Sequence, residues 1–176
     1  PILRQRLTLA ADRPLIYAIG DVHGCLAPLL ALEERIRVDA ASRMADQPLL
    51  LYLGDYVDRG PASRAVIEHL AKRDHGDGIE RIALCGNHDD TFLKFIFNPH
   101  QHLRWLDYGG DATLRSYGLD LTDYPDRDGA MHALGTALRR AVPQHHIDFL
   151  QNMPIAVSSG DRLFVHAGIV PGVPLA

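Results

Sequence analysis

The sequence predicts an α/β fold built around a mostly parallel sheet. Three times in the first half of the chain, an apolar run ends in a polar loop that begins with glycine, and a segment with helical spacing of apolar residues follows. The loops begin at Gly20, Gly54 and Gly86, which are 34 and 32 residues apart. A βαβ crossover takes about 30 residues or more, so this spacing fits successive parallel strands joined by helices.

The boundaries of these three units follow from local composition. The apolar runs are rich in leucine, isoleucine and tyrosine, and Pro61 suits the entry of the second helix. After the third strand, a loop at 86–88 leads into a helix with an aromatic face that includes Phe92. We expect strands at 14–19, 49–53 and 81–85 and helices at 25–37, at 62–73 and after 88.

The second half of the chain has a different pattern. Turn-forming residues break residues 98–152 into short helical segments, which we interpret as a helical insertion on one side of the sheet. A hairpin around the turn sequence SSGD then closes on His166. The expected elements are helices at 130–141 and 144–152 and strands at 155–157 and 162–165.

Length and composition restrict the class of protein. The 176 residues suit a single domain over 1–176, with 47% hydrophobic and 23% charged residues. A formal net charge of -4 without a basic stripe argues against nucleic acid as a partner. No apolar window is long enough for a membrane span, and Cys25 and Cys85 form no C-x-x-C pair, so we expect a cytoplasmic protein. The oligomeric state stays open.

Polar side chains with metal-binding or phosphate-binding chemistry follow each predicted strand. Ligands of open α/β sheets bind beyond the carboxyl ends of the strands, so we expect these side chains to meet in one crevice. Each loop alone would fit an ordinary turn, and only the convergence of four strand ends favours a site. The candidate residues are Asp21, His23, Asp55, Asp58, Arg59, Asn87, His88 and His166.

The donor types in this set suit two divalent cations. Asp21 and His23 are two residues apart and can reach one ion, while Asp55 carries two oxygens and can bridge two ions. Asn87 and His166 could complete a second site, and mixed nitrogen and oxygen donors suit Mn, Fe or Zn. Two such ions would activate a water molecule as hydroxide for attack on a phosphoryl group.

The remaining candidates have roles in the same chemistry. Arg59 can clamp phosphate oxygens, His88 can act as general acid for the leaving oxygen, and Asp58 can orient His88. The histidines outside this constellation, among them His69 and His146, are expected at the surface.

Four motifs, GDVHG, GDYVDRG, GNHD and HAG, occur in this order between Gly20 and Gly168. In order and interval they resemble the calcineurin-like metallophosphoesterases, in particular the phosphoprotein phosphatase branch with its bacterial and phage serine/threonine phosphatases. The resemblance implies a β-sandwich of two mixed sheets flanked by helices, a dinuclear metal centre, and direct attack of metal-bound hydroxide without a phosphoenzyme.

The resemblance also implies a role for each matching residue. Asp21, His23 and Asp55 would hold the first metal, and Asp55, Asn87 and His166 the second. His88 would be the general acid with Asp58 as its partner. Arg59, together with Asn87 and His88, would contact the substrate phosphate.

Two departures from the family pattern affect the functional prediction. Family members carry a further metal histidine in a Gly-His motif well after the HAG motif, so the resemblance implies that this chain lacks its C-terminal part. In GNHD, Asp89 stands at a position where many protein phosphatases have glutamate. Relatives that cleave diadenosine polyphosphates also tend to have aspartate at this position. Some of those relatives lack an aspartate equivalent to Asp58, which this chain has.

We therefore predict a metal-dependent phosphatase for phosphomonoesters, with phosphoserine or phosphothreonine proteins as substrates and manganese as the favoured metal. Two alternatives stay open. One is a dinucleoside polyphosphate hydrolase on the same scaffold, and the other is a non-catalytic binding module with an incomplete metal site.

Overall fold

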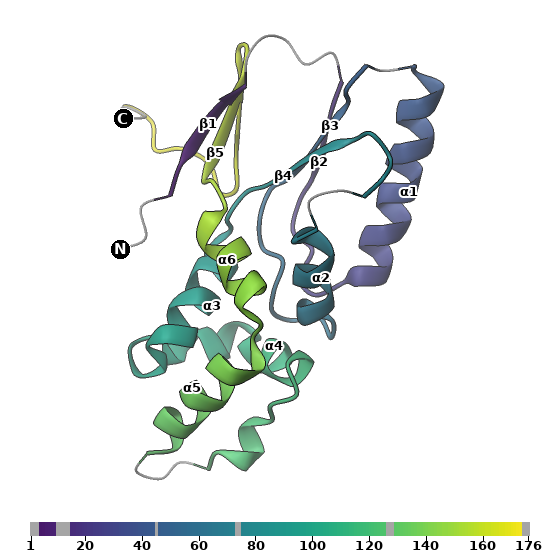
Figure 1. The fold of residues 1–176 in the computed structure, drawn as a ribbon. Helices are drawn as coiled ribbons and strands as arrows, with labels where there is room; N and C mark the ends of the chain where they lie inside the picture. Colours follow the sequence, from purple (N-terminus) through teal and green to yellow (C-terminus); the bar gives the residue numbers. More distant parts are fainter. Residues whose placement is uncertain (1–3, 10–14, 45, 73–74, 126–128, 174–176) are drawn as a thin grey trace.

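The computed structural model contains two three-stranded sheets with helices around them (Figure 1). One sheet has the order β1-β5-β6 and the other the order β2-β3-β4. The strands are β1 (Arg6–Leu9), β2 (Ile16–Ile19), β3 (Leu49–Tyr52), β4 (Glu80–Ala83), β5 (Ala156–Ser159) and β6 (Arg162–Val165). The structure describes residues 4–9, 15–44, 46–72, 75–125 and 129–173.

The predicted α/β fold with two sheets is confirmed. Strands β2, β3 and β4 are parallel, as successive βαβ units require, with Ile16 opposite Leu49 and Leu49 opposite Glu80. The other sheet is the mixed one, because β1 pairs with β5 in parallel and β5 pairs with β6 as an antiparallel hairpin. Strand β1 was not predicted, since its pairing partner lies about 150 residues away in the sequence.

The helices cover one face and one end of the parallel sheet (Figure 1). Helices α1 and α2 lie on the face of this sheet, whereas α3 to α6 gather beyond the carboxyl ends of its strands. Short 3-10 helices connect α3 to α4 and α4 to α5. The helices are α1 (Leu26–Ser42), α2 (Ser63–Leu70), α3 (Asn87–Phe97), α4 (Gly110–Ser116), α5 (Ala130–Ala141) and α6 (Gln144–Asn152).

Strand β3 explains why the run LLLY is apolar throughout. All four of its side chains are buried, because they alternate between two cores. Leu49 and Leu51 pack between the two sheets together with Val157. Leu50 and Tyr52 point to the other side and pack against the helices.

The third loop differs from the prediction. Helix α3 begins at Asn87, so Asn87 and His88 occupy its first turn and not a loop. Gly86 is extended at the N-cap, and the carboxylate of Asp89 accepts a hydrogen bond from the Gly86 backbone N–H at 2.9 Å. This contact from the third helical residue back to the N-cap is one half of a capping box. It stabilises a helix start that lies earlier than the apolar periodicity indicated.

The other predicted boundaries are close to those observed. Helices α5 and α6 match the prediction, and α1 runs five residues further than expected, to Ser42. Pro14 and Arg73, which belonged to a predicted strand and a predicted helix, lie outside the described residues, as do residues 126–128 of the predicted helical insertion. Within the described ranges, no helix combines the length and the apolar character that crossing a membrane requires.

Candidate functional site

The structure brings the predicted site residues to one edge of the two sheets. Asp21 and His23 follow β2, Asp55 follows β3, and His166 follows β6. The end of β6 lies beside the end of β3, because His166 Nδ1 is 2.9 Å from the carbonyl oxygen of Leu53. One ligand atom each from Asp21, Asp55 and His166 lies within 4.8 Å of the other two. The same holds for His23, Asp55 and His88.

Two imidazoles in this cluster have a defined tautomer. His23 Nδ1 lies 2.8 Å from the carbonyl oxygen of Val57, and His166 Nδ1 lies 2.9 Å from that of Leu53. Because a carbonyl oxygen only accepts hydrogen bonds, Nδ1 carries the proton in both rings. In the neutral form, each Nε2 is therefore left with a free lone pair.

Both free lone pairs face oxygen atoms. His23 Nε2 is buried and has no hydrogen-bond partner among the described residues, and it lies 3.7 Å from Asp21 Oδ2 and 3.8 Å from Asp55 Oδ2. His166 Nε2 lies 3.3 Å from Asp55 Oδ2 and 3.0 Å from Asn87 Oδ1. Lone pairs that face each other repel unless a cation lies between them, and donors sharing one ion at about 2.1 Å lie roughly 3–4 Å apart. These residues therefore fit divalent metal ions.

The backbone of the site is held in an unusual conformation. His23, Asp55, Asp58 and Arg59 all have positive φ angles, between 42° and 73°. This region is costly for residues with a side chain, and it persists only where surrounding contacts enforce it. The carbonyl oxygen of Asp55 accepts from the N–H groups of Val22 and His23, which ties the first loop to the second.

Asp89 fixes the remaining geometry, a role that the sequence did not reveal. Its fully buried carboxylate accepts hydrogen bonds from the backbone N–H groups of Asp55, Tyr56 and Gly86 at 2.8 to 2.9 Å. Burial raises the pKa of Asp89 to about 6, against these hydrogen bonds, which lower it. Gly86 is required beside it, because a Cβ there would lie 2.1 Å from Asp55 Oδ1.

Asp58 is buried and anchors His88. Its Oδ2 lies 2.6 Å from His88 Nδ1 and accepts from Trp105 Nε1 at 2.8 Å. Its Oδ1 accepts from the Thr113 hydroxyl at 2.8 Å, and the same hydroxyl accepts from the Asp58 backbone N–H. Burial raises the pKa of Asp58, and the hydrogen bonds from His88, Thr113 and Trp105 oppose this effect. Sequence reasoning missed Trp105 and Thr113, which come from the helical segment.

Arg59 lies at the exposed side of this pair. Its guanidinium Nη2 is 3.3 Å from His88 Nε2, and its backbone N–H donates to the carbonyl oxygen of Gly109. His88 Nε2 is also 3.9 Å from Asp55 Oδ2, so the imidazole edge lies between the cluster and the guanidinium. The geometry thus places the exposed guanidinium of Arg59, the His88 imidazole held by Asp58, and the cluster of candidate metal ligands side by side.

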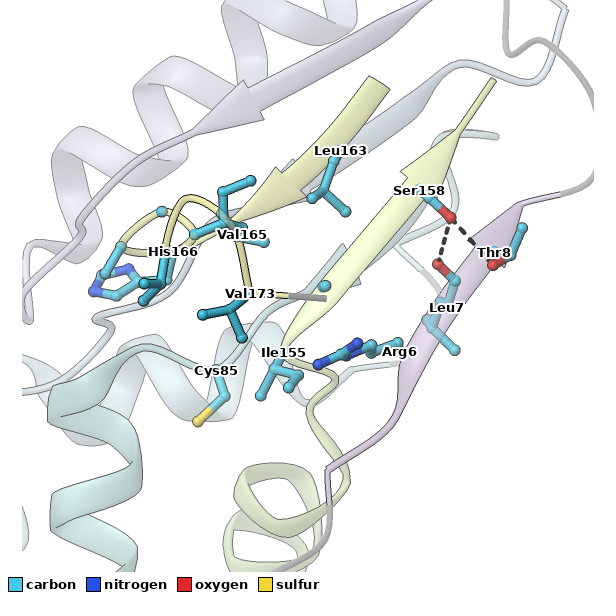
Figure 2. Close-up of a pocket in the computed structure, with 15 residues that line it drawn as sticks. Arg6, Leu7, Thr8, Cys85, Ile155, Ser158, Leu163, Val165, His166 and Val173 are labelled. Atoms are coloured by element: carbon cyan, nitrogen blue, oxygen red, sulfur yellow. Dashed lines mark hydrogen bonds between the residues drawn. The ribbon is translucent and has the colours of Figure 1, made fainter. Parts of the chain in front are cut away.

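An apolar hollow lies beside the site. Figure 2 shows it against the β1-β5-β6 sheet, lined by side chains that include Arg6, Ile155, Leu163 and Val173, with a volume of about 540 Å³. His166 is the residue that it shares with the candidate site among the described lining residues. The hollow therefore adjoins the cluster at one corner and does not enclose it.

Comparisons with known proteins agree on the family. A family model described as Calcineurin-like phosphoesterase matches residues 14–171. A protein named bis(5'-nucleosyl)-tetraphosphatase, symmetrical, from Janthinobacterium sp. (strain Marseille) is 33% identical over 158 residues, which cover 88% of this chain and 44% of the relative. The protein of that name from Ectopseudomonas mendocina (strain ymp) is 31% identical over 163 residues, which cover 92% of this chain and 47% of the relative.

The chain spans less than half the length of these two curated relatives. A crystal structure provisionally assigned as a diadenosine tetraphosphatase has a TM-score of 0.57 at 21% identity, covering 98% of this chain and 59% of that chain. At this identity the likeness shows the fold alone. Because the family match extends over most of the sequence, the chain belongs to the calcineurin-like phosphoesterase family.

Proposed function

We propose that this chain carries the metal-binding part of a dinucleoside polyphosphate hydrolase. The observation that carries the proposal is the match of 88% and 92% of the chain to two relatives named symmetrical bis(5'-nucleosyl)-tetraphosphatases. These relatives favour the dinucleotide alternative over the phosphoserine or phosphothreonine proteins that the sequence first suggested. Symmetrical cleavage of diadenosine tetraphosphate would break a P–O bond between the second and third phosphates, add one water and give two molecules of ADP.

We further propose which residues would hold the metal. Asp21, His23 and Asp55 would bind one divalent ion, and Asp55, Asn87 and His166 a second. The free Nε2 lone pairs of His23 and His166 support this assignment. When bound, such ions would polarise a phosphoryl oxygen and lower the pKa of a water molecule, and manganese, iron or zinc suits the donors.

The other three residues would act on the substrate directly. The exposed guanidinium of Arg59 would turn to the phosphate oxygens, to which it offers a planar pair of N–H donors. This movement would release His88 Nε2, from which Arg59 Nη2 is 3.3 Å away. His88, held through Nδ1 by Asp58, would then take up a proton from solvent at Nε2 and transfer it to the leaving oxygen. Asn87 would share the phosphate contact.

A direct substrate comparison tests the proposal. The chain is incubated with manganese and either diadenosine tetraphosphate or a phosphoserine peptide, and products are separated by ion-exchange chromatography. We expect ADP from the dinucleotide at a higher rate than phosphate from the peptide. Loss of this activity in His88→Ala, but not in the exposed control Asp161→Asn, would assign it to the site.

Two other outcomes would overturn the proposal. Faster release of phosphate from the peptide would restore the phosphoprotein phosphatase reading. Tight binding of the dinucleotide with no turnover, by protein that holds no manganese, would favour a non-catalytic binding module.

A further inference from the structure

A second group of metal-competent side chains lies away from the candidate site. Glu33 comes from α1, His69 from α2, and His75 from the connection between α2 and β4. One ligand atom from each lies within 4.8 Å of the other two. These elements cover the helical face of the β2-β3-β4 sheet, and none of the three residues belongs to the cluster at the strand ends. The sequence predicted His69 at the surface, whereas its side chain is only 15% exposed, because α2 packs against α1.

Glu33 provides a buried carboxylate. Its residue is 9% exposed, and its Oε1 accepts a hydrogen bond from the Tyr52 hydroxyl at 2.8 Å. His69 Nε2 lies 3.0 Å from Oε1 and 2.9 Å from Oε2. The carboxylate is therefore oriented by a neighbouring hydroxyl, as metal-binding carboxylates commonly are.

His75 completes the group with an unused nitrogen. Its Nε2 is buried and has no hydrogen-bond partner among the described residues. The ring centroids of His69 and His75 are 4.8 Å apart and the ring planes make an angle of 73°, so the edges of both rings can face a common point. Burial, followed by the positive charge of Arg81, lowers the pKa of His75 and favours the neutral imidazole that binds metals.

The surrounding charge also permits a cation. Outside the cluster, the positive charge of Arg81 acts on both Glu33 and His75, and two N–H groups of its guanidinium donate hydrogen bonds to Asp77 at 2.6 and 2.8 Å. Because the positive charge of Arg81 is paired with the negative charge of Asp77, the negative charge of Glu33 is available to a cation. A buried anion beside two imidazoles has the composition of a transition-metal site.

We propose that Glu33, His69 and His75 bind a divalent transition-metal ion of the zinc type, separate from the ions of the candidate active site. Two imidazoles and one carboxylate are a common zinc donor set, and a water would take the fourth position. In a tetrahedral site with bonds of about 2.0–2.1 Å, nitrogen and oxygen donors lie about 3.3 Å apart. His69 Nε2 and Glu33 thus need to separate by only about 0.4 Å to admit the ion.

Such an ion would join three segments that are distant in sequence. It would tie α1, α2 and the α2–β4 connection together over the sheet whose strand ends carry the candidate active site. Zinc would then bind the folded chain and not the unfolded one, and at 100 times the dissociation constant it would raise the folding equilibrium constant about 100-fold.

A second cluster with the same composition provides the matched control. Glu68, His145 and His146 also bring their ligand atoms within 4.8 Å of one another. However, His146 Nε2 and His145 Nε2 bind Glu68 at 2.8 and 2.9 Å, and His146 Nδ1 contacts the Tyr117 hydroxyl at 2.9 Å. Among the described residues, the buried nitrogens without a hydrogen-bond partner include His75 Nε2 but none from this group, so we assign zinc to the other cluster.

The test uses the whole chain with the candidate active site disabled by Asp55→Asn and His166→Ala, because Asp55 belongs to both metal-competent groups of that site. Zinc chloride is titrated calorimetrically into this protein and into versions that also carry His75→Ala or His145→Ala. We expect one zinc ion to bind, at least a tenfold weaker affinity with His75→Ala, and unchanged affinity with His145→Ala. Circular dichroism without zinc checks that each variant folds.

A second measurement uses the unsubstituted chain, so that its result does not depend on the folding of a variant. Nitrogen NMR of the unsubstituted chain should show zinc-dependent shifts of the His69 and His75 imidazoles, without matching shifts of the His145 and His146 imidazoles. Absence of these shifts, or zinc affinity that falls with His145→Ala and not with His75→Ala, would overturn the proposal.

Discussion

The hydrogen bonds between Thr113 and Asp58 give a sharp prediction for the substitution Thr113→Val. Valine keeps the shape of threonine and removes its hydroxyl, which accepts from the Asp58 N–H and donates to Asp58 Oδ1, both at 2.8 Å. A hydrogen bond to a charged group contributes about 1.5–3 kcal/mol, and a buried group left without its partner adds to the cost. The N–H keeps only a longer contact of 3.2 Å with Ser63. We expect Thr113→Val to lower the free energy of unfolding by about 2–4 kcal/mol.

Equilibrium urea unfolding in the presence of a chelator measures this loss without a contribution from metal binding. Thr136→Val is the matched control, because Thr136 lies on α5 and, within the described part of the chain, its hydroxyl accepts a single hydrogen bond of 3.3 Å, from Arg139. We expect the control to change the free energy of unfolding by less than about 0.5 kcal/mol. If Thr113→Val and Thr136→Val have the same free energy of unfolding, the hydrogen bonds from Thr113 do not stabilise the buried Asp58.

Two further predictions concern the packing around the site. Gly86→Ala would place a methyl group 2.1 Å from Asp55 Oδ1, whereas Gly20→Ala would meet nothing within 4 Å. We expect Gly86→Ala to lower the free energy of unfolding in urea by more than about 2 kcal/mol and to abolish manganese binding. Gly20→Ala should leave the free energy of unfolding nearly unchanged. Equal losses in the two variants would contradict the geometry. Cys25 is exposed and Cys85 is buried, so a thiol reagent should label one thiol rapidly in the native chain, and rapid labelling of both would refute the described packing.

The sequence predicted those parts of the site that depend on local order. Asp21, Asp55 and His166 each lie within three residues of the end of a strand. The hydrophobic pattern locates strands well enough to place such residues at one edge of the sheets. Their roles as metal ligands stay predictions. The same reasoning placed the helices α5 and α6, which have clear periodicity and turn residues at their ends.

Residues whose function depends on packing were not predictable in this way. Trp105 and Thr113 reach Asp58 from a segment about 50 residues further along, and nothing in the local sequence indicates that contact. His146 was expected at the surface but its side chain is fully buried, because α6 packs against α2 and brings Glu68 to it. Which face of a short helix meets a neighbour follows from tertiary structure and not from periodicity alone.

Manganese binding by the chain and by Asp55→Asn tests the central claim most directly. Asparagine keeps the size of aspartate but removes the charge that lies next to His23 and His166 in the cluster. Isothermal titration of manganese should show binding to the chain, at least tenfold weaker binding to Asp55→Asn, and unchanged binding to the exposed control Asp161→Asn. Equal manganese affinity for the chain and for Asp55→Asn would contradict the account.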